Sequence, residues 1–490
     1  MARATVRWRG LLLLLFCLAQ FLDVFNSSAL FTAIASITAS LRLSVANSVW
    51  LLSAYQLTFA SFLLLSGRIS DVYKYVFVGG LAAFGLMSLG SGFVDNQIAF
   101  LVLRALIGVA AALTIPSALA LIVHMYPNPE TQGRAIAAFG GSVAIGNVSG
   151  LIIGAALVEK ASWRWIFWIV AMVAIPVAAS VALLVPSELA RGDDLDLSTK
   201  KELDIAGIIL LTSSLILFIF SVTSGSSSTW KSATTLVPLF VSLLMFTAFW
   251  LWERRVPSAR AALPLGLWSY PNFGLFFAVA LLPMFWWTTV LFQFTTFWQE
   301  IYQWSSLKAA VHLLPIGLLA FPVMIVASKG LPIGDKSIIL IGEVLTLAGS
   351  ILLTFSNTPA LYWSRNFVGF CIGTVGTALV FARANIIILQ TTPNELAGTV
   401  SAIFNAALQL GSATGVSIIS SIQNSVESSG SDPFRGRAAG LWALTAFVAA
   451  ELIAVSFLWR SGTSNEISLE PKVRSHLGED EPLSIVVEET

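Results

Sequence analysis

The chain has 490 residues, of which 57% are hydrophobic and only 11% are charged, and its formal net charge is +1. Soluble globular chains carry about a quarter charged residues, so this composition excludes an ordinary soluble domain. No basic patch with interleaved aromatic residues occurs, which argues against a nucleic-acid partner.

The apolar residues gather in runs of about 20, the length that crosses a bilayer as a helix. The sequence therefore predicts an all-α polytopic membrane protein with fourteen transmembrane helices. The predicted spans are residues 10–34, 48–67, 75–94, 98–123, 134–158, 164–186, 204–223, 234–252, 272–297, 306–328, 336–356, 361–388, 398–422 and 438–459. The first run resembles a signal peptide, but it continues through Ile34 without a small-residue cleavage site, which favours an uncleaved span.

An even number of spans places both termini on one side. In this topology eighteen of the 27 Lys and Arg residues lie on the side of the termini and eight on the other, with Arg104 inside a span. Because Lys and Arg accumulate in cytoplasmic loops, we expect both termini in the cytoplasm.

The domain organisation follows from these spans. In order we expect a cytoplasmic N-terminus (1–9), a six-helix half (10–186), a cytoplasmic linker (187–203), two inserted helices (204–252), a second linker (253–271), a second six-helix half (272–459) and a disordered cytoplasmic tail (460–490).

A repeat relates the two halves. Four residues in the first half recur 265 residues later, namely Glu130, Gly133, Gly146 and Gly150 as Glu395, Gly398, Gly411 and Gly415. An Arg-x-x-x-Gly pattern at Arg104 and Gly108 is echoed at Arg365 and Gly369. We interpret these pairs as an internal repeat with a buried arginine in each copy, the alternative being chance recurrence among 35 glycines.

Two buried charges are the candidates for function in the first half. Asp23 lies 14 residues beyond Arg9, which is roughly 21 Å of helix and near the middle of a bilayer. Burial disfavours a charged carboxylate and a nearby cation favours it, so a carboxyl that approaches Arg104 suits proton coupling. A lone arginine in lipid is costly and should face a protein interior or a water-filled cavity. A structural ion pair or a hydrogen-bonded cap is the alternative for both residues.

The segment after the second span is a candidate cytoplasmic gate. Gly67 permits close helix approach, and Asp71 can pair with basic residues or a helix N-terminus, with Arg68 and Lys74 in the same loop. In the fourth and fifth spans Gly108, Gly146, Gly150 and Gly154 are small residues that let helices pack closely.

The ninth span is rich in aromatic residues: Phe285, Trp286, Trp287, Phe292, Phe294, Phe297 and Trp298. We expect most of them in an interfacial belt or in the core, and Trp287 and Gln293 are the candidates for contact with a substrate. Glu343 is a further charge inside a span and joins the candidate pathway.

Several motifs, in chain order, resemble those of the major facilitator superfamily, in particular its fourteen-span drug:proton antiporter group common in fungi. The motifs are Gln20–Asp23 with Asn26, Trp50–Thr58 leading into Gly67–Asp71, Arg104 with Gly108, Gly146–Gly154, and Ser162–Trp168. The resemblance covers nearly all of residues 10–460. It implies a major facilitator fold with two six-helix halves, and it adds Gln20 and Asn26 to the pathway. Two departures are Leu151, where the antiporter motif has a proline, and a loop after Asp71 without the usual second glycine and Arg-Lys pair.

The sequence contains neither G-x-x-x-x-G-K-[ST] nor H-E-x-x-H, so no ATPase module, metal site, cofactor or enzyme activity is expected. Energy must then come from a gradient. We expect a monomeric, proton-coupled exporter of small organic molecules such as drugs, toxins or secondary metabolites, whose partners are the substrate, protons and the lipid bilayer. An importer or facilitator and a non-transporting sensor are the alternatives. The plasma membrane is the expected location and the vacuolar membrane the other candidate.

Overall fold

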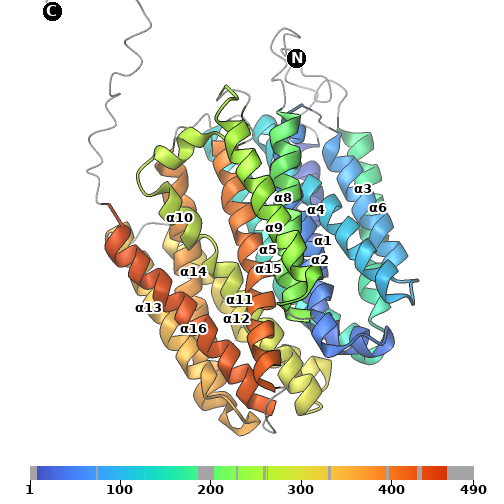
Figure 1. Cartoon of the computed structure of the whole chain (residues 1–490). Coiled ribbons are helices and arrows are strands. Elements are labelled where there is room, and N and C mark those ends of the chain that lie inside the picture. The colour runs from blue at the N-terminus through green and yellow to red at the C-terminus, as the bar shows by residue number, and fades with distance from the viewer. Residues whose placement is uncertain are drawn as a thin grey trace, which may run out of the picture.

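The computed structural model describes residues 8–72, 75–126, 128–185, 204–227, 230–257, 261, 263–328, 333–392, 397–427 and 433–460. All regular secondary structure in these ranges is helical, and the long helices stand side by side in one bundle (Figure 1). The predicted all-α class is therefore confirmed. A helix satisfies its own backbone N–H and C=O groups, which an apolar bilayer interior requires.

Six helices form the first group: α1 (Arg9–Ser40), α2 (Trp50–Val72), α3 (Val76–Ser91), α4 (Gln97–Met125), α5 (Pro129–Lys160) and α6 (Arg164–Leu184). Two follow: α8 (Ile205–Ser227) and α9 (Ala233–Glu253). The last group is α10 (Phe273–Val279), α11 (Leu282–Thr296), α12 (Ser306–Ser328), α13 (Asp335–Thr354), α14 (Phe367–Gln390), α15 (Ala397–Glu427) and α16 (Pro433–Leu458). Short 3-10 or π-helical turns are η2 (Val45–Val49), η4 (Leu265–Ser269), η5 (Phe297–Ile301), η6 (Pro359–Leu361) and η7 (Tyr362–Asn366).

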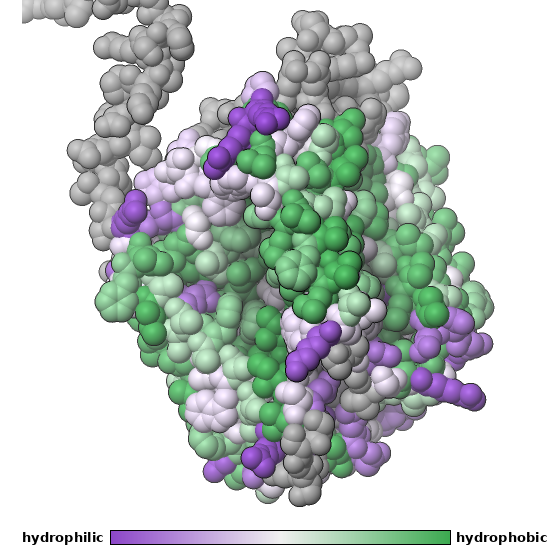
Figure 2. Space-filling model, viewed as in Figure 1, coloured by the Kyte–Doolittle hydropathy of each residue, from purple (hydrophilic) through white to green (hydrophobic). Residues whose placement is uncertain are grey.

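Twelve helical segments of the described chain are long and apolar enough to cross a bilayer. The chain is therefore an integral, multi-pass membrane protein. Figure 2 shows apolar residues covering much of the visible face between more polar ends, as expected for a surface in contact with lipid. Helix α3 has only 16 residues, and α2 is not among the twelve, so the count of fourteen spans stays a prediction.

The first and last groups of helices pack in the same pattern. Helix α1 packs on α5 as α11 packs on α15, α2 on α4 as α12 on α14, and α3 on α4 and α6 as α13 on α14 and α16. The groups meet where α2 contacts α15 and α5 contacts α12. Helix α8 packs against both α2 and α15, and α9 covers α8. The two groups are thus copies of one arrangement, with α8 and α9 added at the side.

Helix α1 begins and α16 ends at the same end of the bundle, the top of Figure 1. We call this the terminal end and the other the opposite end. At the terminal end the Tyr126 hydroxyl donates to the Arg9 carbonyl oxygen at 3.2 Å, and the Asn272 side chain bonds the backbone of Arg460 through two contacts of 2.9 Å.

The expected ninth span, 272–297, corresponds to the apolar segment Phe273–Ile301, but it is not one continuous α-helix. It is divided into α10 and α11, with a break at Ala280 and Leu281. Pro283 lies in the first turn of α11, and because proline has no N–H group it cannot continue the hydrogen-bond ladder of α10. The second span also differs from prediction, because α2 remains helical past Gly67 to Val72 and so includes part of the predicted gate loop.

Candidate functional site

The close approach of α4 to α2 positions the candidate site. A Cβ atom added to Gly108 would lie 2.3 Å from the Tyr55 carbonyl oxygen, so only glycine fits there. Thr58 Oγ1 donates to the Ala105 carbonyl oxygen at 2.6 Å, and Arg104 Nε donates to that of Leu51 at 3.2 Å. These contacts fix Tyr55 and Arg104 in neighbouring helices.

Tyr55 joins the two predicted charges. Its hydroxyl donates to Asp23 Oδ1, and the Arg104 guanidinium carbon lies 5.0 Å from the centre of its ring. All three side chains are buried, with exposed fractions of 8% for Asp23, 4% for Tyr55 and 1% for Arg104. Opposite charges share one buried tyrosine, which is how the protein compensates for taking them out of water. Tyr55 belongs to the Trp50–Thr58 motif, but the sequence did not predict it as a functional residue.

Further polar groups surround Asp23 on α1. Gln20 and Asn26 are buried one turn to either side of it. Gln20 Oε1, both side-chain polar atoms of Asn26 and Arg104 Nη1 have no hydrogen-bond partner among the described residues. Buried polar groups are normally paired, so this part of α1 is available to a polar ligand or a proton carrier.

The glycines of α5 hold α1 in place. A Cβ atom on Gly146 would lie 2.8 Å from the Phe21 carbonyl oxygen, and one on Gly150 would lie 2.7 Å from that of Phe25. Gly154 lies against Ala29 in the same way. Small residues at four-residue spacing thus bring the two backbones together on both sides of Asp23.

The repeat partners of these glycines make the equivalent contact. Gly411 of α15 lies against the Leu281 carbonyl oxygen and Gly415 against Phe285, at the start of α11. The glycine pairs 265 residues apart therefore occupy corresponding positions. The prediction of a second buried arginine is wrong, however. Arg365 is only half-buried in η7 at a helix end, where it donates to the Phe355 carbonyl oxygen.

The two groups of helices are joined toward the opposite end by polar contacts. Gln299 Nε2 donates to the Thr32 carbonyl oxygen at 3.3 Å, and Gln56 Nε2 donates to Ser412 Oγ at 2.5 Å. The Leu307 N–H donates to Glu159 at 3.3 Å. These bonds link α1, α2 and α5 to the C-terminal helices.

The aromatic residues of α11 and η5 are packed inside the bundle rather than in an interfacial belt. Phe285, Trp286, Trp287, Phe292, Phe294, Phe297 and Trp298 are all buried. Of the two expected places, the core is confirmed for these residues and the interfacial belt is not, because α11 packs against α1, α14 and α15. Trp287 Nε1 and both side-chain polar atoms of Gln293 have no hydrogen-bond partner among the described residues.

An ion pair beside Gln293 was not anticipated. Arg437 of α16 is buried and donates to the Gln293 carbonyl oxygen at 3.2 Å, to Thr296 Oγ1 at 2.9 Å and to Glu300 Oε2 at 3.3 Å. Nothing in the sequence pairs Glu300 with Arg437, because they meet only when α16 packs on the end of α11.

Two further predictions concern Glu343 and the cytoplasmic gate. Glu343 is in α13, which packs chiefly on α14 and α16, so it is not a neighbour of Asp23. The side chains of Arg68 and Asp71, the packing around Gly67 and all of Lys74 lie outside the described residues.

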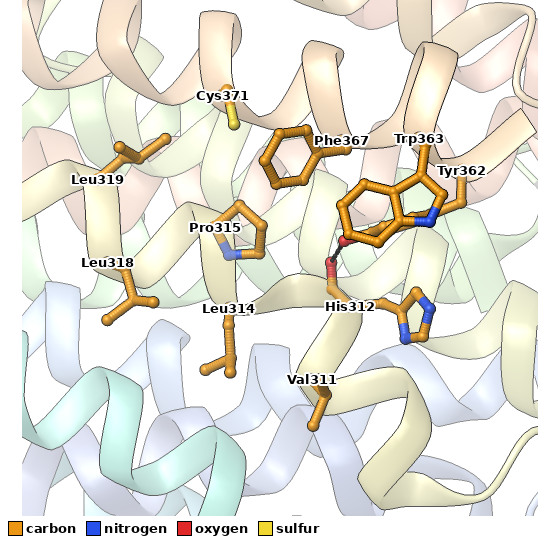
Figure 3. A pocket seen from close by; sticks show the side chains of 10 residues that line it. All are labelled: Val311, His312, Leu314, Pro315, Leu318, Leu319, Tyr362, Trp363, Phe367 and Cys371. Atoms are coloured by element: carbon orange, nitrogen blue, oxygen red, sulfur yellow. Dashed lines mark hydrogen bonds between the residues drawn. The ribbon is translucent and has the colours of Figure 1, made fainter.

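Figure 3 shows a groove of about 420 Å³ between α12 and the start of α14. Its lining is almost wholly apolar, and the Tyr362 hydroxyl donates to the His312 carbonyl oxygen at 2.8 Å beside it. Val311, Leu318 and Trp363 are exposed, Trp363 by 72%. The groove therefore opens on the apolar exterior of the bundle and is separate from Asp23.

Comparison with known proteins gives the family. A family model described as Major Facilitator Superfamily matches residues 16–416. The chain is similar to the puromycin resistance protein pur8 of Streptomyces alboniger, at 30% identity over 427 residues that cover 85% of this chain and 82% of the relative. It is also similar to the major facilitator superfamily multidrug transporter mfsC of Aspergillus fumigatus, at 26% identity over 410 residues, or 80% and 75% of the two chains.

Among solved structures, a bacterial homologue of the human lysosomal transporter Spinster, in an inward-facing and unoccupied conformation, matches with a TM-score of 0.64. The match covers 93% of this chain and 98% of that chain at 14% identity, and it shows a shared fold.

Proposed function

Because the chain belongs to the major facilitator superfamily and is a transporter rather than an enzyme, we propose that it exports small organic molecules in exchange for protons. The export direction is supported by the relatives, one named for puromycin resistance and one for multidrug transport. Both match this chain over most of their length.

The observation that carries proton coupling is the buried contact of Asp23 with Tyr55 and Arg104. Asp23 lies roughly 21 Å along α1 from Arg9, which is near the middle of a membrane span. An ionisable residue at that depth is costly unless it has a function. A carboxyl group is the one member of this cluster that gains and loses a proton readily.

The geometry suggests how the proton acts. Charged Asp23 accepts a hydrogen bond from the Tyr55 hydroxyl and attracts Arg104, so α1 is tied to α2 and α4. A proton on Asp23 removes its charge and weakens that tie. Since α1 also contacts α11 and α12 of the other group, this weakening alters the interface between the two groups. Protonation and the relative motion of the halves are thereby coupled, as alternating access requires.

The substrate site belongs between the two groups of helices, at the level of Asp23. On α1 the side chains of Gln20 and Asn26 have polar atoms without a hydrogen-bond partner in the described part of the chain, and so do Trp287 and Gln293 on α11. Aromatic and apolar walls with a few polar groups suit organic molecules of mixed polarity. We assign the two six-helix halves to residues 10–186 and 272–459 and the inserted pair to 204–252, with a monomer as the working unit.

The orientation follows from charge. We assign the terminal end to the cytoplasm because eighteen Lys and Arg residues fall on that side of the predicted topology, against eight on the other. Residues 67–74 then form the cytoplasmic gate. The plasma membrane is the assigned location, since export from the cell requires it.

Accumulation of puromycin in cells with and without the chain tests the proposal. Cells with the chain should hold less puromycin, and collapse of the proton gradient by an uncoupler should raise it to the level of cells without the chain. Asp23→Asn should behave like the absence of the chain while reaching the membrane in equal amount. Asp95→Asn is the matched control, because this carboxylate is 84% exposed. If collapse of the gradient lowers accumulation instead, the chain is an importer and the proposal is wrong.

A further inference from the structure

The C-terminal half contains two buried carboxyl groups that the proposed transport cycle does not use. Glu343 of α13 is fully buried, and Glu451 of α16 is 7% exposed. None of their four carboxyl oxygens has a hydrogen-bond partner among the described residues. Unpaired buried charges are too costly to keep, so these groups need either a proton or a partner.

The packing of α13 and α16 brings the two glutamates to a similar depth in neighbouring helices. The helices run antiparallel, and Lys336 Nζ of α13 donates to the Ser456 carbonyl oxygen of α16 at 3.0 Å. Glu343 is seven residues after Lys336, and Glu451 is five residues before Ser456, so the two lie at nearly equal depth. That depth is about 10–12 Å from the terminal end of each helix. Glu343 is close enough to act electrostatically on Glu451.

Among the described residues, no cation on the surrounding helices neutralises the pair. Helices α10 and α11 contain no charged residue. At the terminal end Arg383 of α14 is paired with Asp335, and Lys336 is bonded to Ser456. The other ionisable groups described on the elements packed against α13 and α16 lie toward the opposite end: Tyr362, Arg365, Cys371, Glu427, Arg435 and Arg437.

We propose that Glu343 and Glu451 form a proton-binding dyad, a second proton site that is separate from Asp23. The two carboxyl groups hold at least one proton between them. Two neighbouring carboxylates cannot both stay ionised away from water, so their titration belongs to the pair. Loss of the last proton places two like charges between α13 and α16 and weakens that contact.

The dyad is connected to the central helices. Phe447 lies one turn before Glu451 on α16 and stacks on Phe285 of α11, with ring centroids 4.2 Å apart. Phe285 in turn lies against Gly415 of α15. A change in the α13–α16 contact therefore reaches the helix that faces α1. The short distance to the terminal end makes that side the source of the proton.

Infrared and thermal measurements on the full chain in lipid nanodiscs test the dyad. The protonated carboxyl should give a carbonyl stretch that is retained at pH 7 and lost in the double variant of Glu343→Gln with Glu451→Gln. Between pH 5 and 8 the wild-type melting temperature, read from tryptophan fluorescence, should fall as pH rises. The folded dyad keeps a proton that the unfolded glutamates release, so the unfolding constant rises about tenfold per pH unit for each such proton.

The variants separate the dyad from the proposed transport mechanism. Asp23→Asn should keep the infrared band and the fall in melting temperature, whether or not it transports. The double glutamine variant should lose both, and Asp95→Asn should lose neither. If the double variant does not fold, Glu451→Gln alone should retain one carboxyl band at an altered frequency. A wild-type chain without the band overturns the proposal. So does a melting temperature that rises with Na⁺ or K⁺ at fixed pH, because the pair would then hold a metal cation.

Discussion

The two halves pack in the same helix pattern but handle buried charge in opposite ways. In the N-terminal half Asp23 and Arg104 are opposite charges that share Tyr55 across three helices. In the C-terminal half Glu343 and Glu451 are two acidic side chains with no hydrogen-bond partner among the described residues. The first cluster compensates its charge internally, whereas the second needs a proton from outside.

This difference shows what the repeated fold determines and what it leaves open. The fold determines which helices touch, as the glycine contacts of α5 on α1 and of α15 on α11 demonstrate. The side chains at each contact then decide whether it is a neutralised pair or a proton-dependent one. Both clusters are buried, so both respond strongly to the loss of a single charged group.

The largest effect is expected from Arg104→Gln. Removing the cation leaves Asp23 buried beside Tyr55 without its countercharge, which should cost about 3–5 kcal/mol of the free energy of unfolding. The melting temperature in nanodiscs measures this loss. Arg104→Lys should recover only part of it, because an ammonium group cannot reproduce the flat guanidinium over the ring. Wild-type stability for Arg104→Gln would mean that the first cluster is not internally compensated.

Alanine at the close-packed glycines should produce the next largest effect. In Gly108→Ala and Gly150→Ala the new Cβ would meet backbone oxygens at less than 3 Å, so each should lower the free energy of unfolding by about 1–3 kcal/mol. Gly140→Ala is the control within α5, because nothing lies within 4 Å of its Cβ position. That variant should be unchanged or slightly more stable. Equal losses at Gly140 and Gly150 would contradict the packing role.

Tyr55→Phe sharpens the comparison by keeping the ring and removing only the hydroxyl. Asp23 then loses a hydrogen bond to its charged form, worth about 1.5–3 kcal/mol. The pH dependence of puromycin transport in liposomes should move to higher pH, because the carboxylate takes up a proton more easily. Phe59, whose ring stacks on Tyr55, offers a control in Phe59→Leu, which should change stability without moving the pH profile. An unmoved profile in Tyr55→Phe would remove the hydroxyl from the coupling mechanism.

The smallest effect on stability is expected from Gln293→Leu. Both polar atoms of this side chain are buried without hydrogen-bond partners among the described residues, so an apolar side chain of similar size should change the unfolding free energy by less than about 1 kcal/mol. Puromycin transport should nevertheless fall if Gln293 contacts the substrate. A variant with full transport would exclude Gln293 from the substrate site.

Helices and their repeat could be read from the sequence because each depends on local patterns. Apolar runs of about 20 residues marked the spans, and Gly146 with Gly150 marked the contact that Gly411 and Gly415 repeat. The division of the ninth span was missed, although Pro283 was a visible signal for it. Arg365 was misassigned because an Arg-x-x-x-Gly pattern does not say how deep a residue lies.

The clusters themselves could be read only in part. Asp23 and Arg104 stood out because charges are rare in apolar helices, but Tyr55 did not, since a tyrosine in a span is unremarkable by composition. Glu343 stands out in the sequence as a charge inside a span, but nothing there relates it to Glu451, because 108 residues separate them and only the antiparallel packing of α13 and α16 makes them neighbours. Contacts between helices distant in sequence depend on packing that no short motif encodes.

Proton movement measured during substrate transport tests the central claim most directly. Proteoliposomes that contain the chain and an internal pH dye are given puromycin on one side. The account predicts that wild-type protein moves protons opposite to puromycin, and that Asp23→Asn, with a normal melting temperature, moves none. Proton movement in Asp23→Asn equal to that of the wild type would contradict the account.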